Sequence, residues 1–335
     1  TGAYDVTFSA AVKTASVGAA TYKNFPLVSS RTFSLLSGSD GVAPISRAEV
    51  SAPALMAARR GLYALDKIEE MMTVVVPDFA DDTTILGDLF DYAATRRDIF
   101  VPYCTPSGKS AQQALDWLRV KLARNSKYSA CYWPWVRVAD PLGRGRPTVF
   151  PPSGHVAGIY ARTDRNKNVG KAPGGTLDGA LQFLVGLEYA PPKGDRDLVY
   201  PAGINPLLDS VQTGRAVWGV RTTSLESDWR YINAVRVFQF IEKSLYNATH
   251  WVMFENNGPG LWVRIKLQAE SFLNARFQDG YFAGRTPAEA FFVICDETNN
   301  TPQTIAEGKT IVDYGIAPHR PSEFLINRFQ QLQAA

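Results

Sequence analysis

Cysteine and histidine are scarce in this sequence, and each scarcity excludes a class of site. Among 335 residues there are three cysteines and three histidines. Cys104, Cys131 and Cys295 lie far apart in apolar or aromatic stretches, which predicts buried free thiols rather than a disulfide framework or a zinc ribbon. The sequence has no HExxH motif and no tight cluster of histidines and carboxylates, so we expect no metal site.

A surplus of one charge and long apolar runs are also lacking. Lysine and arginine number 35 against 32 acidic residues, and the net charge of +3 is too small for a protein that binds the phosphate backbone of nucleic acids. Charged or turn residues interrupt every apolar stretch well short of about 18 residues, so no transmembrane helix is expected. We therefore predict neither nucleic acid nor a membrane as a partner.

What is present is the composition of a folded globular chain. Hydrophobic residues make up 45% and charged residues 20%, and the length corresponds to about two domains. The chain starts at Thr1 without an initiator methionine or a signal-peptide pattern. We therefore expect a fragment or processed chain that is not secreted by a signal peptide, lacks N-terminal residues and is by itself a monomer or weak oligomer.

The pattern of the first 215 residues predicts two regions. Within residues 1–40, Tyr4, Val6 and Phe8 alternate with small or polar residues, which predicts the edge of a β-rich N-terminal or insertion domain. Residues 41–215 alternate helices and strands, a pattern typical of a mostly parallel sheet covered on both faces. The expected helices are 47–60, 82–97, one opened by the capping box of Ser110 and Gln113, and one after Ser153; the expected strands are 73–76, 98–104 and 129–138.

Residues 216–335 predict a smaller α+β unit. Asp228 is suited to cap a long amphipathic helix, and a second helix over 261–278 follows a short turn, so the two should pack as an antiparallel hairpin. The expected strands are 216–222, 291–295, 310–317 and 324–329.

Local patterns that suggest chemistry lack essential parts. The loop Ser107-Gly108-Lys109-Ser110 stands where a phosphate-binding loop would, but Tyr103 replaces the glycine that such a loop needs, so a helix cap is the better interpretation. Ser153 and His155 lie in no hydrolase motif. The aromatic residues 132–135 favour core packing or a subunit contact, and the basic loop 143–146 a solvated loop or a protein partner. We predict no catalytic or cofactor-binding residue, and an assembly protein rather than an enzyme.

Eight segments together resemble one family, the contractile tail sheath proteins of bacteriophages, R-type pyocins and related injection machines. They occur in the family's order and span residues from about 37 to 330, although residues 1–36 match nothing in it. Departures are small, such as Val220 where the family usually has alanine, Gly174-Gly175 for Ala-Asn, and Ala234-Val235 for Val-Arg. The segments are YWPWV (132–136), PPSGHVAGIYARTD (151–164), KAP (171–173), GIN (203–205), VWGVRT (217–222), WRYIN (229–233), AFFV (290–293) and IAPHRPSEF (316–324).

The resemblance implies a fold and a set of site residues. The fold class is α/β: a subtilisin-like mixed or parallel sheet domain without a catalytic triad over 41–215, and a smaller α+β C-terminal domain over 216–335, beside the β-rich stub at 1–40. Lys309, in the connection 296–309, is the candidate for a charge facing an acidic tube. The candidate strands that link subunits contain Ile311, Val312, Tyr314, Phe324, Ile326 and Phe329.

The resemblance also implies the function. Copies of the chain would stack as six-membered rings into a helical tube around an inner tail tube protein, meet baseplate and tail-terminator proteins, and contract to drive the tube through a cell envelope. Such a subunit is made in the host bacterial cytoplasm, becomes part of a virion tail sheath or equivalent particle, and needs no cofactor. Two alternatives stay open: a nucleotide-binding α/β enzyme that uses Gly108-Lys109-Ser110, and a static shell protein that does not contract.

Overall fold

The computed structural model describes residues 14–17, 20–23, 45–140 and 146–323, which fall into two compact units, 1–49 and 50–335. In the first unit, β1 (Thr14–Val17) and β2 (Ala20–Lys23) pair antiparallel, with Thr14 opposite Lys23. The alternating stretch around Tyr4 to Phe8 and the rest of the predicted stub lie outside the described residues.

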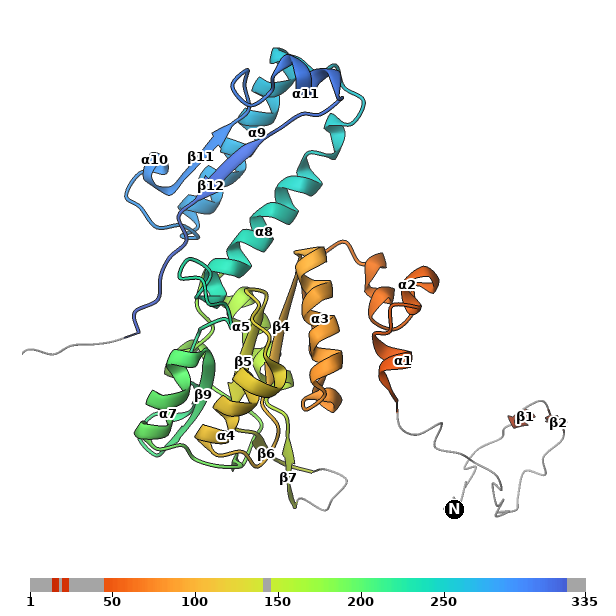
Figure 1. The fold of residues 1–335 in the computed structure, drawn as a ribbon, viewed down its shortest axis with the longest axis vertical. Helices are drawn as coiled ribbons and strands as arrows, with labels where there is room; N and C mark the ends of the chain where they lie inside the picture. Colours follow the sequence, from red (N-terminus) through yellow and green to blue (C-terminus); the bar gives the residue numbers. More distant parts are fainter. Residues whose placement is uncertain (1–13, 18–19, 24–44, 141–145, 324–335) are drawn as a thin grey trace, which may run out of the picture. The chain divides into compact units, whose positions relative to one another are not determined.

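A mixed five-stranded sheet forms the centre of the second unit (Figure 1). Its order is β10–β9–β5–β4–β3, in which β3, β4, β5 and β9 run parallel and β10 runs antiparallel to β9. Every residue of β4 and β5 is buried, and because successive side chains point to opposite faces, both faces of the sheet are covered, as predicted. The strands are β3 (Met72–Thr73), β4 (Ile99–Cys104), β5 (Ser129–Trp133), β9 (Ile204–Ser210) and β10 (Gly214–Val217).

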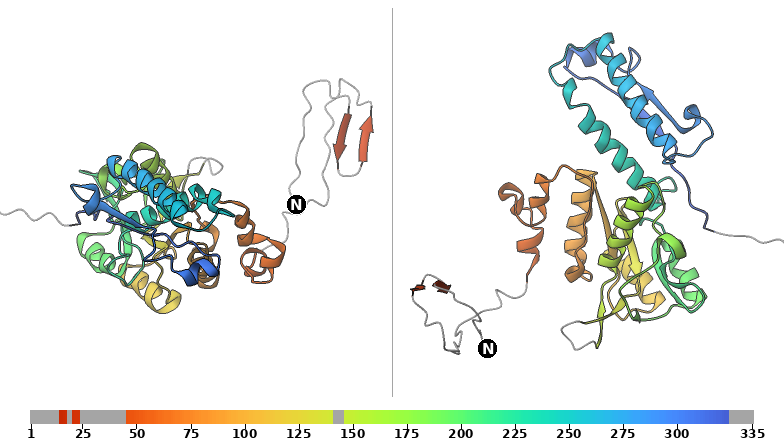
Figure 2. Two further views of the ribbon diagram at one scale, coloured as in Figure 1. Left: turned by 90° about the horizontal axis from the view of Figure 1, so that it is seen from above. Right: turned by 180° about the vertical axis from the view of Figure 1, so that it is seen from behind.

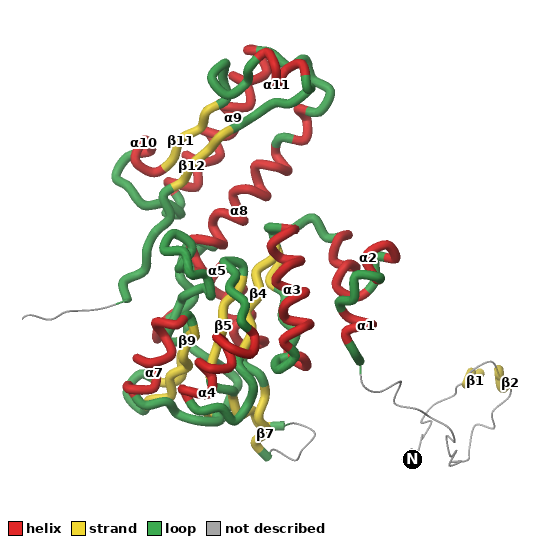
Figure 3. The backbone as a smooth tube through the Cα atoms, in the orientation of Figure 1, coloured by secondary structure: helices red, strands yellow, loops and turns green. Residues whose placement is uncertain are grey.

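Several helices of the second unit pack around this sheet (Figure 3), and the beginnings of helices follow local sequence rules. Asp82 caps the helix α3, since its carboxylate accepts from the amides of Thr84 and Ile85, and Ser110 with Gln113 forms the predicted capping box of α4. Residues 47–60 form two short helices instead of the single expected one, because Pro53 interrupts the run. The helices are α1 (Arg47–Val50), α2 (Leu55–Ala58), α3 (Thr83–Arg96), α4 (Ala111–Asp116, continued by a π-helical turn to Leu122), α5 (Ser153–Asn166), α6 (Gly175–Asp178) and α7 (Lys193–Val199).

Two predicted strands are shorter than expected. At the sheet edge, β3 ends at Thr73 rather than at Val76, and the chain turns at Pro77. The aromatic stretch divides at Pro134, and its second half joins a small antiparallel sheet of order β7–β6–β8. That sheet consists of β6 (Val136–Ala139), β7 (Pro147–Phe150) and β8 (Gly186–Leu187).

The last third of the chain pairs two long helices with a two-stranded sheet. The first helix begins at Ile232 and not after Asp228, because residues 221–222 pair with 230–231 and keep that segment extended. For the same reason β10 ends at Val217 rather than continuing to Thr222. The elements are α8 (Ile232–Ala248), α9 (Pro259–Gln278), α10 (Pro287–Ala290), β11 (Phe291–Ile294), α11 (Pro302–Ala306) and β12 (Asp313–Ile316).

Helix α8 contributes to two hydrophobic cores. Ile232 and Val235 belong to the large core around the five-stranded sheet, whereas Val237, Ile241 and Leu245 belong to a second core with α9, β11 and β12. Figure 2 shows α8 running from one region to the other and α9 beside β11. The three cysteines are buried and free, as predicted. None of the described helices is both long and apolar enough to cross a membrane.

Candidate subunit interface

The sheet β11–β12 has one face on the second core and one face exposed. Its antiparallel register places Phe292 opposite Gly315 and Val293 opposite Tyr314. Val293 and Tyr314 pack inward, whereas Phe292 and Ile294 are 55% and 37% exposed on the outer face. A Cβ at Gly315 would lie 2.3 Å from the Phe292 ring, so any larger residue there would displace that ring. The outer face therefore presents apolar side chains to the surroundings.

Both outer edges of this sheet carry backbone groups that point away from the paired strand. The amide of Ala317 donates to the carbonyl of Ala290, which identifies this as a hydrogen-bonded pair of the antiparallel ladder. Hydrogen-bonded and non-hydrogen-bonded pairs alternate, so Val293 on β11 and Tyr314 and Ile316 on β12 direct their amides outward. Within the described residues no third strand pairs with β11 or β12. Such edges are templates for strand addition by another segment.

A groove lies along each of these edges. Beside β11, a groove of about 660 Å³ is lined by α9, by the short helix α10 and by the strand residues Phe291 to Val293. Beside β12, a groove of about 720 Å³ is lined by Val312 and Tyr314 on one side and by α8 on the other. Leu267 on α9, which lines the first groove, is 60% exposed. Each edge therefore has room beside it and an apolar wall.

The residues predicted to link subunits differ in their surroundings in the structure. Val312 and Tyr314 are half-buried and line the β12 groove. Ile311 precedes β12, and both of its backbone groups bond the Asn300 side chain, with its amide 2.7 Å from Oδ1 and its carbonyl 2.9 Å from Nδ2. Phe324, Ile326 and Phe329 lie outside the described residues.

Lys309, the predicted tube-facing residue, lies on an exposed loop just after α11. Its Nζ is 2.6 Å from the Glu307 carboxylate, and its carbonyl accepts from the Asn257 side chain. An exposed pair of this kind adds at most about 1 kcal/mol to stability and leaves the ammonium group accessible.

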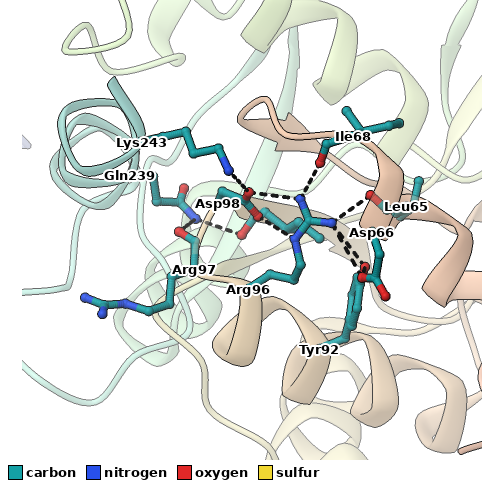
Figure 4. A network of polar contacts seen from close by, with 10 residues as sticks. Leu65, Asp66, Ile68, Tyr92, Arg96, Arg97, Asp98, Gln239 and Lys243 are labelled. Carbon is teal, nitrogen blue, oxygen red and sulfur yellow. Dashed lines mark hydrogen bonds and ion pairs between the residues drawn. The ribbon is translucent and has the colours of Figure 1, made fainter. Parts of the chain in front are cut away.

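Sequence reasoning missed a polar network that joins the two cores (Figure 4). Asp98, which is 5% exposed, accepts two hydrogen bonds from Arg96 and lies 3.2 Å from Nζ of Lys243 on α8. One turn earlier on α8, the side-chain Nε2 of Gln239 donates to the backbone carbonyls of Arg97 and Ile99. These residues fasten α8 to the start of β4. An aspartate directly before an apolar strand was the available signal.

The loop that was compared with a phosphate-binding loop makes contacts within the fold. The Ser110 hydroxyl caps α4, and the Lys109 carbonyl accepts from the Trp133 indole. The Ser153 hydroxyl is buried without a hydrogen-bond partner, and none is formed with His155. Burial lowers the pKa of His155. Of the basic loop, residues 143–145 lie outside the described residues. The described residues contain no cluster of three potential metal ligands.

The aromatic run is packed into the large core, one of the two arrangements favoured for it. Tyr132 and Trp133 are at most 1% exposed, and the Tyr132 hydroxyl is 2.6 Å from that of Tyr160 on α5. The Trp135 indole donates to the Thr105 carbonyl. These side chains are therefore not available as a stacking platform.

Comparison with known sequences places the C-terminal part in one family. Residues 224–331 match the family model described as the phage tail sheath C-terminal domain. The tail sheath proteins of Enterobacteria phage T4 and Vibrio phage KVP40 are 25% and 26% identical over 181 residues, which is 53% of this chain and 26% of each relative. That of Salmonella phage ViI is 22% identical over 254 residues, 71% of this chain and 37% of that protein. The chain thus spans about a quarter of the first two relatives.

Comparison with solved structures extends the likeness to most of the fold. A chain from the cryo-EM structure of the anti-feeding prophage baseplate has a TM-score of 0.73 and 27% identity, covering 87% of this chain and 75% of that one. The anti-feeding prophage helical sheath in the contracted state gives 0.70 and 27%, with coverage of 86% and 76%. The contracted PVC sheath complex of an extracellular contractile injection system gives 0.65 and 28%, with coverage of 75% and 68%. Residues 224–331 thus match the phage tail sheath C-terminal domain, and most of the chain shares the α/β fold of solved contractile sheath structures.

Proposed function

We propose that this chain is a structural subunit of a contractile tail sheath, which polymerises as a helical tube around an inner tail tube and contracts to drive that tube through a cell envelope. The observation that carries the proposal is the two-stranded sheet β11–β12, whose two outer edges both face grooves. Its sheath relatives and its fold support the same function.

In this proposal, neighbouring subunits add strands to the two free edges. Main-chain hydrogen bonds to the outward amides would hold the added strands, and Phe292 and Leu267 would pack against their side chains. Because each contact is head-to-tail and does not close, repetition generates a helix. The added strands keep subunits connected while other contacts are exchanged, and the difference in contact free energy between the extended and contracted arrays drives the tube.

The finer assignments belong to the same proposal. The five-stranded sheet region would be a subtilisin-like domain over 41–215, followed by the C-terminal domain over 216–335, with residues 1–40 as the edge of a β-rich region. The partners would be copies of the chain in six-membered rings, the inner tube near Lys309, and baseplate and tail-terminator proteins. The subunit would be made in the bacterial cytoplasm, act in a tail particle and carry no enzymatic activity or cofactor.

Electron microscopy of the full-length protein tests this function. We expect helical tubes, present in two lengths on particles that also contain the inner tube. Tubes of one invariant length would support a static shell instead, and a failure to form any tube would contradict the proposal.

Deleting the C-terminal residues from 321 onward in the full-length protein is expected to abolish tubes while leaving a folded subunit. The reason is that residues beyond 323 would take part in the strand pairing that links neighbouring subunits. Negative-stain microscopy measures assembly, and far-UV circular dichroism measures folding. A shorter deletion that starts at residue 324 is the matched variant, because it spares residues 321–323. Wild-type tubes from both deletions would refute the linking role of the C-terminal residues.

A further inference from the structure

Three of the family-like segments meet at one place in the fold, beside the strand β9. They are residues 203–205, 217–222 and 316–323, of which the last connects β12 to the C-terminal end of the described chain. Their meeting point is Glu323, which reaches back to Arg221 across 102 residues of sequence. The strand-addition model does not use these residues.

Glu323 is held by two side chains in a nearly closed site. Its Oε1 is 2.8 Å from Nε of Arg221 and 2.6 Å from the Tyr200 hydroxyl, and its Oε2 is 2.6 Å from Nη2 of Arg221. The side chains of Arg221 and Glu323 are only 13% and 7% exposed. The Arg221 guanidinium also lies over the Tyr200 ring, 4.3 Å from its centroid. A bidentate, charge-assisted contact that is largely shielded from solvent is among the stronger polar contacts of a protein.

The backbone of Arg221 is itself fixed to the central sheet. Asn205 on β9 is fully buried; its Oδ1 accepts from the Arg221 amide at 2.7 Å, and its Nδ2 donates to the carbonyls of Arg221 at 2.7 Å and Cys131 at 3.1 Å. Gly219 has to be glycine, because a Cβ there would lie 2.7 Å from both Asn205 Oδ1 and the Tyr200 ring. Glu323 is therefore connected through Arg221 and Asn205 to the strands β9 and β5.

The segment between β12 and Glu323, called the C-terminal tail below, is also held at a point nearer to β12. The side-chain Nδ2 of Asn233, at the start of α8, donates to the backbone carbonyl of His319 at 2.8 Å and to that of Gly170 at 3.1 Å. After β12 the chain is thus held to the large core region by partly buried contacts at His319 and at Glu323.

We propose that Arg221, Tyr200 and Glu323 form an anchor that fixes where the chain beyond residue 323 leaves the subunit. This anchor rests on the proposed function, in which that segment joins a neighbouring subunit. A pull on a segment that left directly from β12 would break the hydrogen bonds of β11–β12 one after another. The anchor instead transfers the load to the buried sheet through Arg221 and Asn205, so the receiving sheet stays intact during contraction.

Acid is expected to release the anchor. Burial opposes ionisation of Glu323, but the hydrogen bonds from Arg221 and Tyr200 outweigh it, and Arg230 adds a smaller attraction, so the pKa of the carboxyl is below its ordinary value. A carboxyl with a lowered pKa in the folded protein stabilises it above the unfolded pKa of about 4.3, and this contribution is lost as the pH falls through the folded pKa. Cleavage of the tail by an acid-active protease should therefore rise below about pH 4, less so in Glu323→Gln.

Proteolysis of the isolated subunit tests the anchor without requiring assembly. Thermolysin cleaves before large apolar residues such as those at 324–326, and the bond must enter its cleft in extended form. We expect Glu323→Gln to accelerate cleavage there by about tenfold or more, because the charge-assisted bonds are lost. Each rate is divided by that of a synthetic peptide of the same sequence, which removes the effect of the substitution on the protease.

Asp228→Asn is the matched control. Asp228 lies 3.7 Å from Arg320 of the same tail, but this pair is 81% and 73% exposed, so its loss should change the rate by less than about twofold. Tyr200→Phe, which removes one of the three hydrogen bonds, should give an intermediate rate. A normalised rate for Glu323→Gln equal to that of the wild type would overturn the anchor.

The same substitution in the full-length protein tests the role of the anchor. We expect Glu323→Gln sheaths to assemble but to break into short pieces on contraction, whereas Asp228→Asn sheaths stay whole, both by electron microscopy. Fast proteolysis together with intact contracted sheaths would refute the mechanical role of the anchor during contraction, although the contact of Glu323 with Arg221 in the subunit would stand. If wild-type protein formed no sheath, the proposed function would fail while the proteolysis result stood.

Discussion

Tyr314→Pro in the full-length protein is expected to give a folded subunit that no longer assembles into tubes. Tyr314 sits in a non-hydrogen-bonded pair with Val293, so its amide points away from β11 and contributes nothing to the β11–β12 ladder. Proline removes that outward donor and places its ring at the free edge, where an added strand would have to bond. Negative-stain microscopy measures tubes, and circular dichroism with thermal melting measures the fold.

The alanine variant at the same position distinguishes loss of the backbone donor at the strand edge from loss of the Tyr314 side chain. Tyr314→Ala also loses the half-buried ring but keeps the outward amide, so it should melt close to the proline variant and still assemble. Proline at Gly315 should instead damage the fold, because Gly315 belongs to a hydrogen-bonded pair with Phe292. Tubes of normal length from Tyr314→Pro would show that this edge receives no strand.

Asp164→Asn is expected to lower the free energy of unfolding by about 3–5 kcal/mol. Asp164 on α5 accepts from Nη1 and Nη2 of Arg236 on α8, at 2.9 and 2.6 Å. The Arg236 side chain is 3% exposed and lies over the Tyr160 ring, 4.7 Å from its centroid. The amide would leave the guanidinium charge buried without a counter-ion, which costs far more than losing an exposed pair. Urea unfolding followed by tryptophan fluorescence measures the change.

A matched exposed pair provides the control. Lys193 and Asp197 form an (i, i+4) pair on α7 whose side chains are 81% and 59% exposed. Asp197→Asn makes the same chemical change and should cost about 0.5 kcal/mol or less. Equal losses from Asp164→Asn and Asp197→Asn would show that the contact between α5 and α8 is not a buried determinant of stability.

These expectations assign a structural task to arginines that composition alone could not place. Arginine outnumbers lysine in the sequence, and arginine is the basic residue favoured in two-pronged, partly desolvated ion pairs. In the structure, Arg96, Arg221 and Arg236 each pair with a carboxylate of the same chain. Each of these pairs joins segments that belong to different elements or lie at an element's end. Part of the arginine content therefore stabilises the subunit itself.

Several elements could be predicted because their signals are local. The capping box of Ser110 and Gln113 determines where α4 begins, since both of its hydrogen bonds lie within one turn. The apolar run of β4 is buried on both faces, as continuous apolar strands in parallel sheets are. The absence of a complete phosphate-binding loop could also be predicted, because such a loop depends on a fixed spacing of glycines and Tyr103 replaces one of them. Patterns of this kind need no knowledge of the rest of the chain.

Long-range pairing decided what these patterns could not. Asp228 is a good capping residue, yet α8 starts at Ile232, because the pairing of Arg221 with Tyr231 holds the preceding residues extended. Ile311 lies in an apolar run typical of a strand, but Asn300 occupies its backbone groups before β12 begins. In each case a hydrogen bond from a distant residue outweighs a local preference of about 1 kcal/mol.

The sequence by itself determined the fold class, the family resemblance and the absence of recognisable catalytic motifs, because these depend on composition, periodicity and ordered motifs along the chain. Only the tertiary structure decided which strand edges stay open and which motifs meet. Both edges of β11–β12 face grooves because α8 and α9 pack on one face of that sheet and leave its sides free. Glu323 meets Arg221 because the chain returns from β12 to β9, a path set by packing of the whole subunit.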